Sequence, residues 1–321
     1  MSTGVLEGRD GWLFLTGGSN VVATLYDRQS FLLSDAKLQQ WADLMEARAR
    51  RLEAMGIQYV HINIPCKLTI YDHKLNQPPM IDWTLSPAVR LGELVRRSDH
   101  ARVWLDLTEP FRAARDQQRL YYRTDSHWTA EGCFLAYKLL CEKIGIAAVP
   151  SLLGRRSTEV HGLLDLGSKM EPPMPEHISV YNYAQDSVLA YANSVAKYLE
   201  VAQADAKVHV GSHVRYRNDS PGAVKKKILI FGDSYSNTGQ GALTGMLAET
   251  VRDAEFIWSS NFDWSYIRRT RPDVVIYELV ERFMTVLAED RLSLRLISVR
   301  QGLRANWLRL TARGTAAPTK A

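Results

Sequence analysis

Hydrophobic and polar positions follow a helical period early in this chain. From residue 34 to residue 55, apolar side chains recur at three-, four- or seven-residue steps, which places them on one face of a helix. Ser34 stands where a helix N-cap is expected, and Gly56 stands where a left-handed residue ends a helix. The pattern therefore predicts an amphipathic helix over 34–55.

The rest of the chain alternates between short apolar runs and helical segments. The apolar runs predict strands at 58–65, 101–107, 225–232, 254–260 and 272–280. Helical spacing predicts helices at 108–117, with Thr108 as cap, at 129–144, with Thr129 as cap, and at 241–251 and 264–270. Alternating strands and helices predict an α/β fold with a parallel sheet that is covered on both faces. Ligands bind such sheets beyond the carboxyl ends of their strands.

The periodicity also divides the chain into parts. Residues 1–150 form the first part of the expected α/β core, and residues 225–310 form the second part. Between them, residues 151–224 show weak periodicity, which predicts a less regular insertion or a β-rich subdomain. Residues 311–321 are expected to be a disordered tail.

Composition narrows the class of protein. A chain of 321 residues with 46% hydrophobic and 23% charged residues is typical of a globular protein. No apolar run approaches the roughly 20 residues that span a bilayer, and no export signal is visible, which predicts a cytoplasmic location unless a signal has been removed. The net charge of +5 is dispersed and no nucleic-acid module is present. Three cysteines without CxxC spacing argue against a disulfide framework, and Cys133 and Cys141 are expected to be buried apolar residues.

A candidate nucleophile follows the apolar run KKKILIFG. There, Gly232-Asp233-Ser234 leads from the strand towards a helix, so that Ser234 would be exposed at the edge of the sheet. Backbone N–H groups after it could stabilise an oxyanion, and Gly232 allows a tight turn. The alternative is a turn that only caps a helix. Ser236 replaces the second glycine of a GxSxG elbow, so this is not an α/β-hydrolase motif.

A candidate base lies about a hundred residues earlier, in YYRTDSHWTAEG. In an extended or irregular segment, Asp125 could reach Nδ1 of His127 and leave Nε2 free to face a nucleophile. The alternative is a half-buried histidine that only stabilises a turn. His209 and His213 have the spacing of metal ligands on a helix, but their neighbours predict strand and turn. No metal or cofactor is therefore expected.

Several motifs in order resemble one family. GRDGWLFL (8–15), IPCKLTIYDHKL (64–75), Asp-Ser-His-Trp, Gly-Asp-Ser-Tyr-Ser and RPDVVIYELVERF (271–283) are similar to segments of the AlgX/AlgJ-type alginate O-acetyltransferases. This family is the Asp-x-His-Trp branch of a circularly permuted SGNH hydrolase-like fold. The resemblance covers roughly 8–150 and 225–285, and it implies export to the periplasm as the alternative location.

The resemblance implies acetyl-ester chemistry on polysaccharide or glycan hydroxyls. Ser234 would be the nucleophile, His127 the base and Asp125 the residue that orients the base. The partners would be an acetyl donor and a glycan acceptor, and the acetyl group could arrive through a membrane partner. Further candidates for oxyanion or substrate binding are Gly232, Tyr235, Asn237, Lys67, Glu278 and Arg282.

Two other functions fit the same residues. A carbohydrate acetyl esterase needs the same triad, and only water exclusion around the acyl-enzyme separates it from a transferase. A non-catalytic glycan-binding scaffold would keep the fold without turnover, and the tyrosines of the middle segment could stack on sugars. Glu278, Glu281 and Arg282 could line the cleft or form a buried ion-pair network. The acceptor, the donor and the oligomeric state are not fixed by the sequence.

Overall fold

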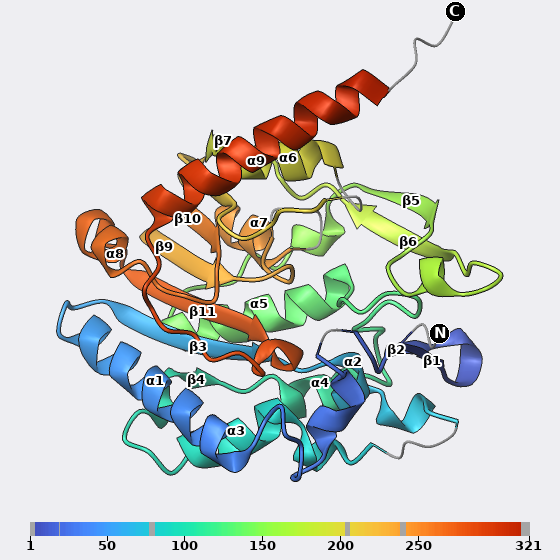
Figure 1. The fold of residues 1–321 in the computed structure, drawn as a ribbon. Helices are drawn as coiled ribbons and strands as arrows, with labels where there is room; N and C mark the ends of the chain where they lie inside the picture. The colour runs from blue at the N-terminus through green and yellow to red at the C-terminus, as the bar shows by residue number, and fades with distance from the viewer. Residues whose placement is uncertain (1–3, 19, 77–80, 203–205, 238–241, 316–321) are drawn as a thin grey trace, which may run out of the picture.

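The fold is built around one seven-stranded, mostly parallel sheet (Figure 1). A computed structural model describes residues 4–18, 20–76, 81–202, 206–237 and 242–315. The strand order is β4-β3-β11-β9-β10-β8-β7. The strands are β3 (Gln58–Ile64), β4 (Trp104–Leu105), β7 (Ser187–Ala192), β8 (His213–Asn218), β9 (Val224–Gly232), β10 (Val251–Trp258) and β11 (Val274–Val280).

The five strands β4, β3, β11, β9 and β10 run parallel, whereas β8 and β7 add antiparallel strands at one edge. Strand β9 lies in the middle with every residue from Ile228 to Gly232 buried. A strand covered on both faces needs apolar residues throughout, which explains its continuous hydrophobic run. The predicted α/β class is confirmed.

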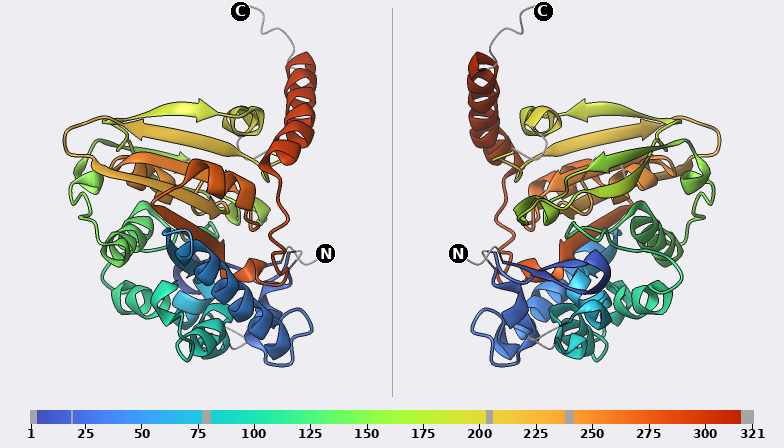
Figure 2. Two further views of the ribbon diagram at one scale, coloured as in Figure 1. Left: turned by 90° about the vertical axis from the view of Figure 1, so that its left-hand side faces the viewer. Right: turned by 90° about the vertical axis from the view of Figure 1, so that its right-hand side faces the viewer.

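Helices cover both faces of the sheet (Figures 1 and 2). Consecutive residues of β11 show which helices lie on which face. Tyr277 faces Arg48 of α1, and Glu278 faces Cys133 of α5. The helices are α1 (Asp35–Glu53), α2 (Lys67–Ile70), α3 (Pro87–Val95), α4 (Thr108–Ala114), α5 (Ala130–Ile144), α6 (Ser194–Ala202), α7 (Leu243–Ala248), α8 (Trp264–Thr270) and α9 (Leu294–Thr315).

The predicted helix ends hold at α1 and α5. The Ser34 side chain accepts the N–H of Lys37, and Gly56 has a φ of +71°. The Thr129 side chain accepts the N–H of Gly132 at the start of α5. Cys133 and Cys141 are buried as expected.

Other boundaries differ from the predictions. The run 101–107 forms only the two-residue strand β4, because its first three residues make a 3-10 turn. Thr108 is not the cap of α4; it is the first helical residue, and Asp106 accepts its N–H. Helix α7 is shorter than predicted, and Gly241 lies outside the described residues. Strand β10 starts three residues earlier than the predicted start at 254.

The middle segment contributes to two sheets. Strands β5 (Ser157–Gly162) and β6 (Glu176–Tyr181) form a separate hairpin, while β7 and β8 extend the central sheet. At the N-terminus, β1 (Val5–Glu7) pairs with β2 (Leu13–Leu15), a hairpin that the hydrophobic pattern did not reveal. The expected tail is helical as far as Thr315, and residues 316–321 lie outside the described residues. Among the helices that the structure describes, none is both long and apolar enough to cross a membrane.

A buried arginine fastens α1 to the loop after β11. The Arg48 side chain is 1% exposed and bonds Asp290 at 2.5 and 2.9 Å. Its guanidinium lies 4.1 Å from the centroid of the Phe262 ring and 4.3 Å from that of Tyr277. Arg48 also donates to the carbonyl of Ser260. One side chain therefore joins a helix, a strand and two loops.

Replacing Arg48 with methionine should lower the free energy of unfolding by about 3–5 kcal/mol, because it leaves the Asp290 carboxylate without its cation. Urea denaturation measures this change. Arg50→Met on the same helix is the control. Its ion pair with Glu46 is exposed, so its loss should cost less than about 1 kcal/mol. Equal losses in the two variants would contradict a stabilising role for the buried pair.

Candidate active site

The nucleophile turn is fixed by the side chain of Asp233. Strand β9 ends at Gly232, and the two oxygens of Asp233 accept the N–H groups of Tyr235 at 3.0 Å and of Val280 at 2.8 Å. These bonds tie the turn to itself and to the end of β11. Ser234 is held between them, half-buried, at the carboxyl edge of the sheet.

Glu278 supports this turn from inside the sheet. It is fully buried, and its Oε2 accepts the N–H of Asp233 at 3.1 Å. Burial and the nearby Asp233 carboxylate raise the pKa of Glu278 well above its usual range, which favours the neutral acid. A Cβ on Gly232 would lie 2.6 Å from the same Oε2. An alanine here would therefore have to displace the Glu278 carboxyl, and Glu278 holds the turn rather than facing a substrate.

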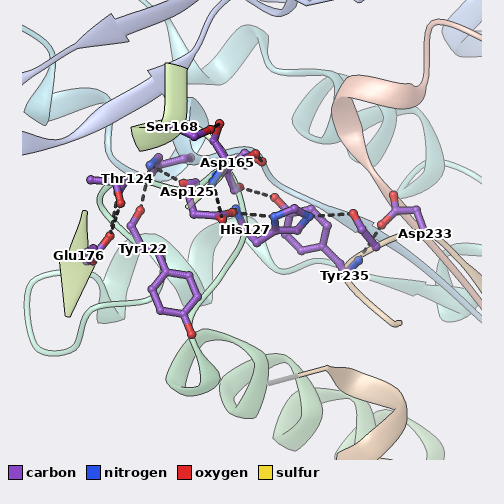
Figure 3. A network of polar contacts seen from close by, with 12 residues as sticks. Tyr122, Thr124, Asp125, His127, Asp165, Ser168, Glu176, Asp233 and Tyr235 are labelled. Carbon is purple, nitrogen blue, oxygen red and sulfur yellow. Dashed lines mark hydrogen bonds and ion pairs between the residues drawn. The ribbon is translucent and has the colours of Figure 1, made fainter. Parts of the chain in front are cut away.

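His127 joins this turn to the Asp125 loop (Figure 3). Its Nε2 lies 2.8 Å from Oγ of Ser234, and its Nδ1 lies 2.6 Å from Oδ1 of Asp125. The same Asp125 oxygen accepts the His127 N–H at 2.7 Å. Burial lowers the pKa of His127, but the Asp125 carboxylate outweighs it and the net pKa is raised; the pKa of Asp125 is lowered despite burial because His127 stabilises its charge. The structure thus brings the predicted base, carboxylate and serine into one hydrogen-bonded chain.

Lys67 holds the base loop in place. Its Nζ donates to the carbonyl oxygens of Tyr122 at 2.9 Å, Arg123 at 2.9 Å and Asp125 at 2.6 Å. Burial lowers the pKa of Lys67 to about 7, and the Asp125 carboxylate opposes that shift. Three carbonyl acceptors match the three N–H donors of an ammonium group. Lys67 therefore positions the loop, in place of the oxyanion contact that we expected from the sequence.

Two carboxylates from the middle segment complete this loop, and sequence reasoning missed both. Asp165 accepts the N–H and hydroxyl of Ser126 at 2.8 and 2.7 Å, and its own N–H reaches Asp125 at 3.3 Å. Glu176 accepts the N–H and hydroxyl of Thr124 at 2.8 and 2.9 Å. They lie in a stretch without periodicity, so only an excess of acidic residues near Gly and Pro could have marked them. The segment 151–224 thus takes part in building the site.

Tyr235 packs behind His127. Its hydroxyl donates to the carbonyl of Ser126 at 2.6 Å and accepts from Arg282 at 3.2 Å, and its ring centroid lies 4.8 Å from that of His127. Trp128 meets the Tyr235 ring edge-on at 5.1 Å. Tyr235 and Arg282 are 1% and 6% exposed. They support the base, and the side chain of Tyr235 has no room to bind an oxyanion.

Glu281 is also structural. It is buried, and it accepts the N–H groups of Cys66 at 2.6 Å and Ala88 at 3.0 Å, together with hydroxyls of Tyr26 and Thr69. Among the described residues, no ion pair links Glu278, Glu281 and Arg282. Each of the three is instead a buried support, held by hydrogen bonds to neighbouring residues and not by an ion-pair network.

The backbone N–H groups around Ser234 differ in whether they are free to bind an oxyanion. The N–H groups of Tyr235 and Ser236 are already bonded to Asp233. The Ser234 N–H has no acceptor among the residues that the structure describes. Asn237 is half-buried and stays the predicted second donor. The Ser234 N–H is thus the available backbone donor beside Oγ.

A cavity of about 580 Å³ opens beside Ser234. It lies at the carboxyl ends of β9, β10 and β11, where Gly232, Trp258 and Leu279 line it. His209 also lines it, with its ring 5.0 Å from that of Trp258. His213 is bonded instead to the buried Glu255 at 2.6 Å, so the two histidines do not converge on a metal.

The described residues include one group of potential metal ligands, Asp125, His127 and Asp165. Nδ1 of His127 is directed at Asp125, and both oxygens of Asp165 are bonded to Ser126. These atoms form a network that fixes the imidazole, and Nε2 is directed at a serine hydroxyl. This donor set suits proton transfer better than cation binding.

A mostly parallel α/β sheet that carries a Ser-His-Asp chain at its carboxyl edge is an arrangement found in several classes of serine-dependent α/β proteins. Residues 5–162 match the family model described as SGNH hydrolase-like domain, acetyltransferase AlgX. The probable alginate O-acetylase AlgJ of Pseudomonas fluorescens is 25% identical over 300 residues, which cover 88% of this chain and 69% of that protein. The chain is similar to the AlgX/AlgJ-type proteins in both comparisons, and the resemblance predicted from its motifs is confirmed.

Solved structures share the fold. The O-acetyltransferase domain of Pseudomonas putida AlgJ has a TM-score of 0.59 at 17% identity, covering 92% of this chain and 97% of that chain. Bacillus cereus PatB1 with a sulfonyl adduct has a TM-score of 0.62 at 15% identity, covering 88% and 98%. The predicted SGNH hydrolase-like fold class is confirmed.

Replacing Gly232 with alanine should lower acetyl-ester turnover by about tenfold or more, because the added Cβ displaces Glu278 and with it the Asp233 turn. Steady-state kinetics with an activated acetyl ester measures this loss. Gly154→Ala is the control, since nothing lies within 4 Å of a Cβ there. Unchanged turnover in Gly232→Ala would show that the packing behind the turn does not position Ser234.

Proposed function

We propose that this protein is a serine-dependent O-acetyltransferase that acetylates polysaccharide or glycan hydroxyls through an acetyl-serine intermediate. Similarity to the AlgX/AlgJ-type proteins supports the reaction class. The observation that carries the proposal is the chain from Asp125 through His127 to Ser234, with contacts of 2.6 and 2.8 Å. This geometry is what an activated serine nucleophile requires.

The first half-reaction acetylates the serine. Nε2 of His127 takes the hydroxyl proton while Oγ of Ser234 attacks the carbonyl carbon of the donor. The oxyanion is stabilised by the Ser234 N–H, with Asn237 as the proposed second donor. As the tetrahedral intermediate collapses, the bond to the donor's leaving group breaks and His127 returns the proton to that group. Asp125 stays ionised and stabilises the imidazolium.

The second half-reaction reverses these roles. A glycan hydroxyl in the cavity gives its proton to His127 and attacks the acetyl carbonyl. The bond to Ser234 then breaks, and Oγ recovers the proton from Nε2. The donor is proposed by class only, as an activated acetyl ester or thioester. The family resemblance adds a membrane partner that supplies the acetyl group and a periplasmic location to this proposal.

Replacing Ser234 with alanine should lower acetyl turnover on the order of 10³-fold or more, because among the described residues Ser234 supplies the one hydroxyl that bonds His127. Ser265→Ala, at an exposed position of α8, is the matched control. Acetate release from an activated ester measures turnover. A Ser234→Ala variant as active as the parent, or a parent with no turnover, would favour the glycan-binding scaffold.

An assay with and without a glycan acceptor distinguishes acetyl transfer from hydrolysis. The parent enzyme is incubated with the activated ester, with and without oligosaccharides, and the sugars are analysed by mass spectrometry. We expect acetylated sugar whose amount grows with acceptor concentration. Free acetate at the same rate in every mixture would instead identify an esterase.

The pH dependence should report the Asp125–His127 pair. Turnover requires neutral His127, so kcat/KM should rise with pH through a pKa above the usual value of 6.5. In Asp125→Asn the carboxylate no longer raises this pKa while burial still lowers it, so the rising limb should move to lower pH. The plateau should also fall, by about 10⁴-fold by analogy with other serine triads.

Asp99→Asn at an exposed position is the control, and its profile should match that of the parent enzyme. Kinetics between pH 5 and pH 9 with a soluble activated ester give both profiles. A limb that stays in place, or that moves to higher pH, would show that Asp125 does not set the pKa of the catalytic base.

A further inference from the structure

Helix α9 stands apart from the α/β core. It runs from Leu294 to Thr315, its first turn packs against the core, and its later turns extend beyond the rest of the molecule beside α6 (Figures 1 and 2). Side chains are described as far as Leu308. Most of α9 has one face packed on α6 and an opposite face exposed to solvent.

The inner face of α9 packs on a small cluster. Ala305 is fully buried against Val195 and Tyr198 of α6 and against Val208. Gly302 faces Ser194, whose Cβ would lie 3.5 Å from an added Cβ. These contacts fix the rotation of the helix about its axis, and so decide which residues face outward.

The outer face carries a stripe of large apolar side chains. Leu296 is 71% exposed, Val299 59%, Leu303 68% and Trp307 63%. Steps of three, four and four residues keep these four positions on one side of a helix. We call this set the apolar stripe. Four large apolar side chains in a row mark an interaction surface more than scattered exposed residues do.

Arginines flank the apolar stripe on both sides. At 100° per residue, Arg295 lies on one side of the stripe, and Arg300 and Arg304 lie on the other. All three are exposed, and no ion pair among the described residues involves them. The sequence contains no Asp or Glu after Asp290, so the whole helix is basic.

We propose that the apolar stripe and its flanking arginines bind an anionic lipid bilayer surface. An apolar face containing Trp and Leu, bordered by cations, is the arrangement of helices that lie in the membrane interface. Arginines beside it would meet lipid phosphates, to which guanidinium groups bind well. A second copy of this chain suits the surface poorly, since it would bring one all-basic helix against another. This inference goes beyond the proposed acetyl transfer and does not depend on it.

Helix α9 also contacts the cavity beside Ser234. Ile297, near the start of the helix, lines the cavity that reaches Ser234. The cavity and a bilayer bound along the apolar stripe would therefore lie on different faces of the same helix.

Co-sedimentation of the whole protein with vesicles tests the proposal. Vesicles of phosphatidylcholine with about a third phosphatidylglycerol are compared with vesicles of phosphatidylcholine alone. We expect binding to the anionic vesicles at least about tenfold tighter, weakening as salt is raised. Equal binding to both compositions, or no binding to either, would overturn the proposal.

Variants assign the binding to α9. Leu296→Gln/Val299→Gln/Leu303→Gln should reduce the vesicle-bound fraction about tenfold or more, because apolar side chains supply the insertion. Arg295→Gln/Arg300→Gln/Arg304→Gln should remove the preference for anionic lipid. The controls are Phe31→Gln/Val188→Gln, at exposed apolar positions elsewhere, and Arg9→Gln/Arg28→Gln/Arg97→Gln, at exposed arginines elsewhere.

Turnover of a soluble acetyl ester and the thermal unfolding midpoint should be unchanged in all these variants, which separates lipid binding from folding and catalysis. Analytical ultracentrifugation tests the other occupant of the stripe. A dimer that the apolar triple variant dissociates, without any vesicle effect, would show that a second copy covers the face and would refute the lipid proposal.

Discussion

The structure of the site depends on one contact, the 2.8 Å approach of His127 Nε2 to Ser234 Oγ. It joins two turns that lie 107 residues apart in the sequence and belong to different parts of the core. A hydrogen bond of this kind tolerates little displacement. Both turns must therefore be immobile before the bond can form, and much of the surrounding structure serves that requirement.

Buried and half-buried carboxylates immobilise the two turns. Asp233 and Glu281 accept backbone N–H groups at the carboxyl edge of the sheet, and Asp165 and Glu176 do the same for the base loop. A carboxylate can accept several N–H donors at once, and each bond satisfies a backbone group that would otherwise be buried unpaired. Glu278 differs, since burial and the neighbouring Asp233 carboxylate raise its pKa well above the usual range, which favours a neutral acid beside Asp233.

The sequence predicted well those elements whose pattern reflects burial. The continuous apolar runs of β9 and β11 and the periodic faces of α1 and α5 have their places in the fold because the sheet is covered on both sides. It predicted poorly those elements held by few contacts. Strand β4 pairs with β3 over two residues only, and the N-terminal hairpin has three pairs, so neither leaves a periodic signal.

For the site, the sequence by itself determined the candidate residues: a serine after a core strand, and a histidine two positions after an aspartate. Tertiary structure decided what surrounds them. Lys67 turned out to bind three carbonyls of the base loop, and Asp165 entered the network from a segment without any pattern. The physical reason is that a nucleophile and its base are set by local chain geometry, whereas the groups that hold them are chosen by proximity in the fold, which periodicity along the chain does not record.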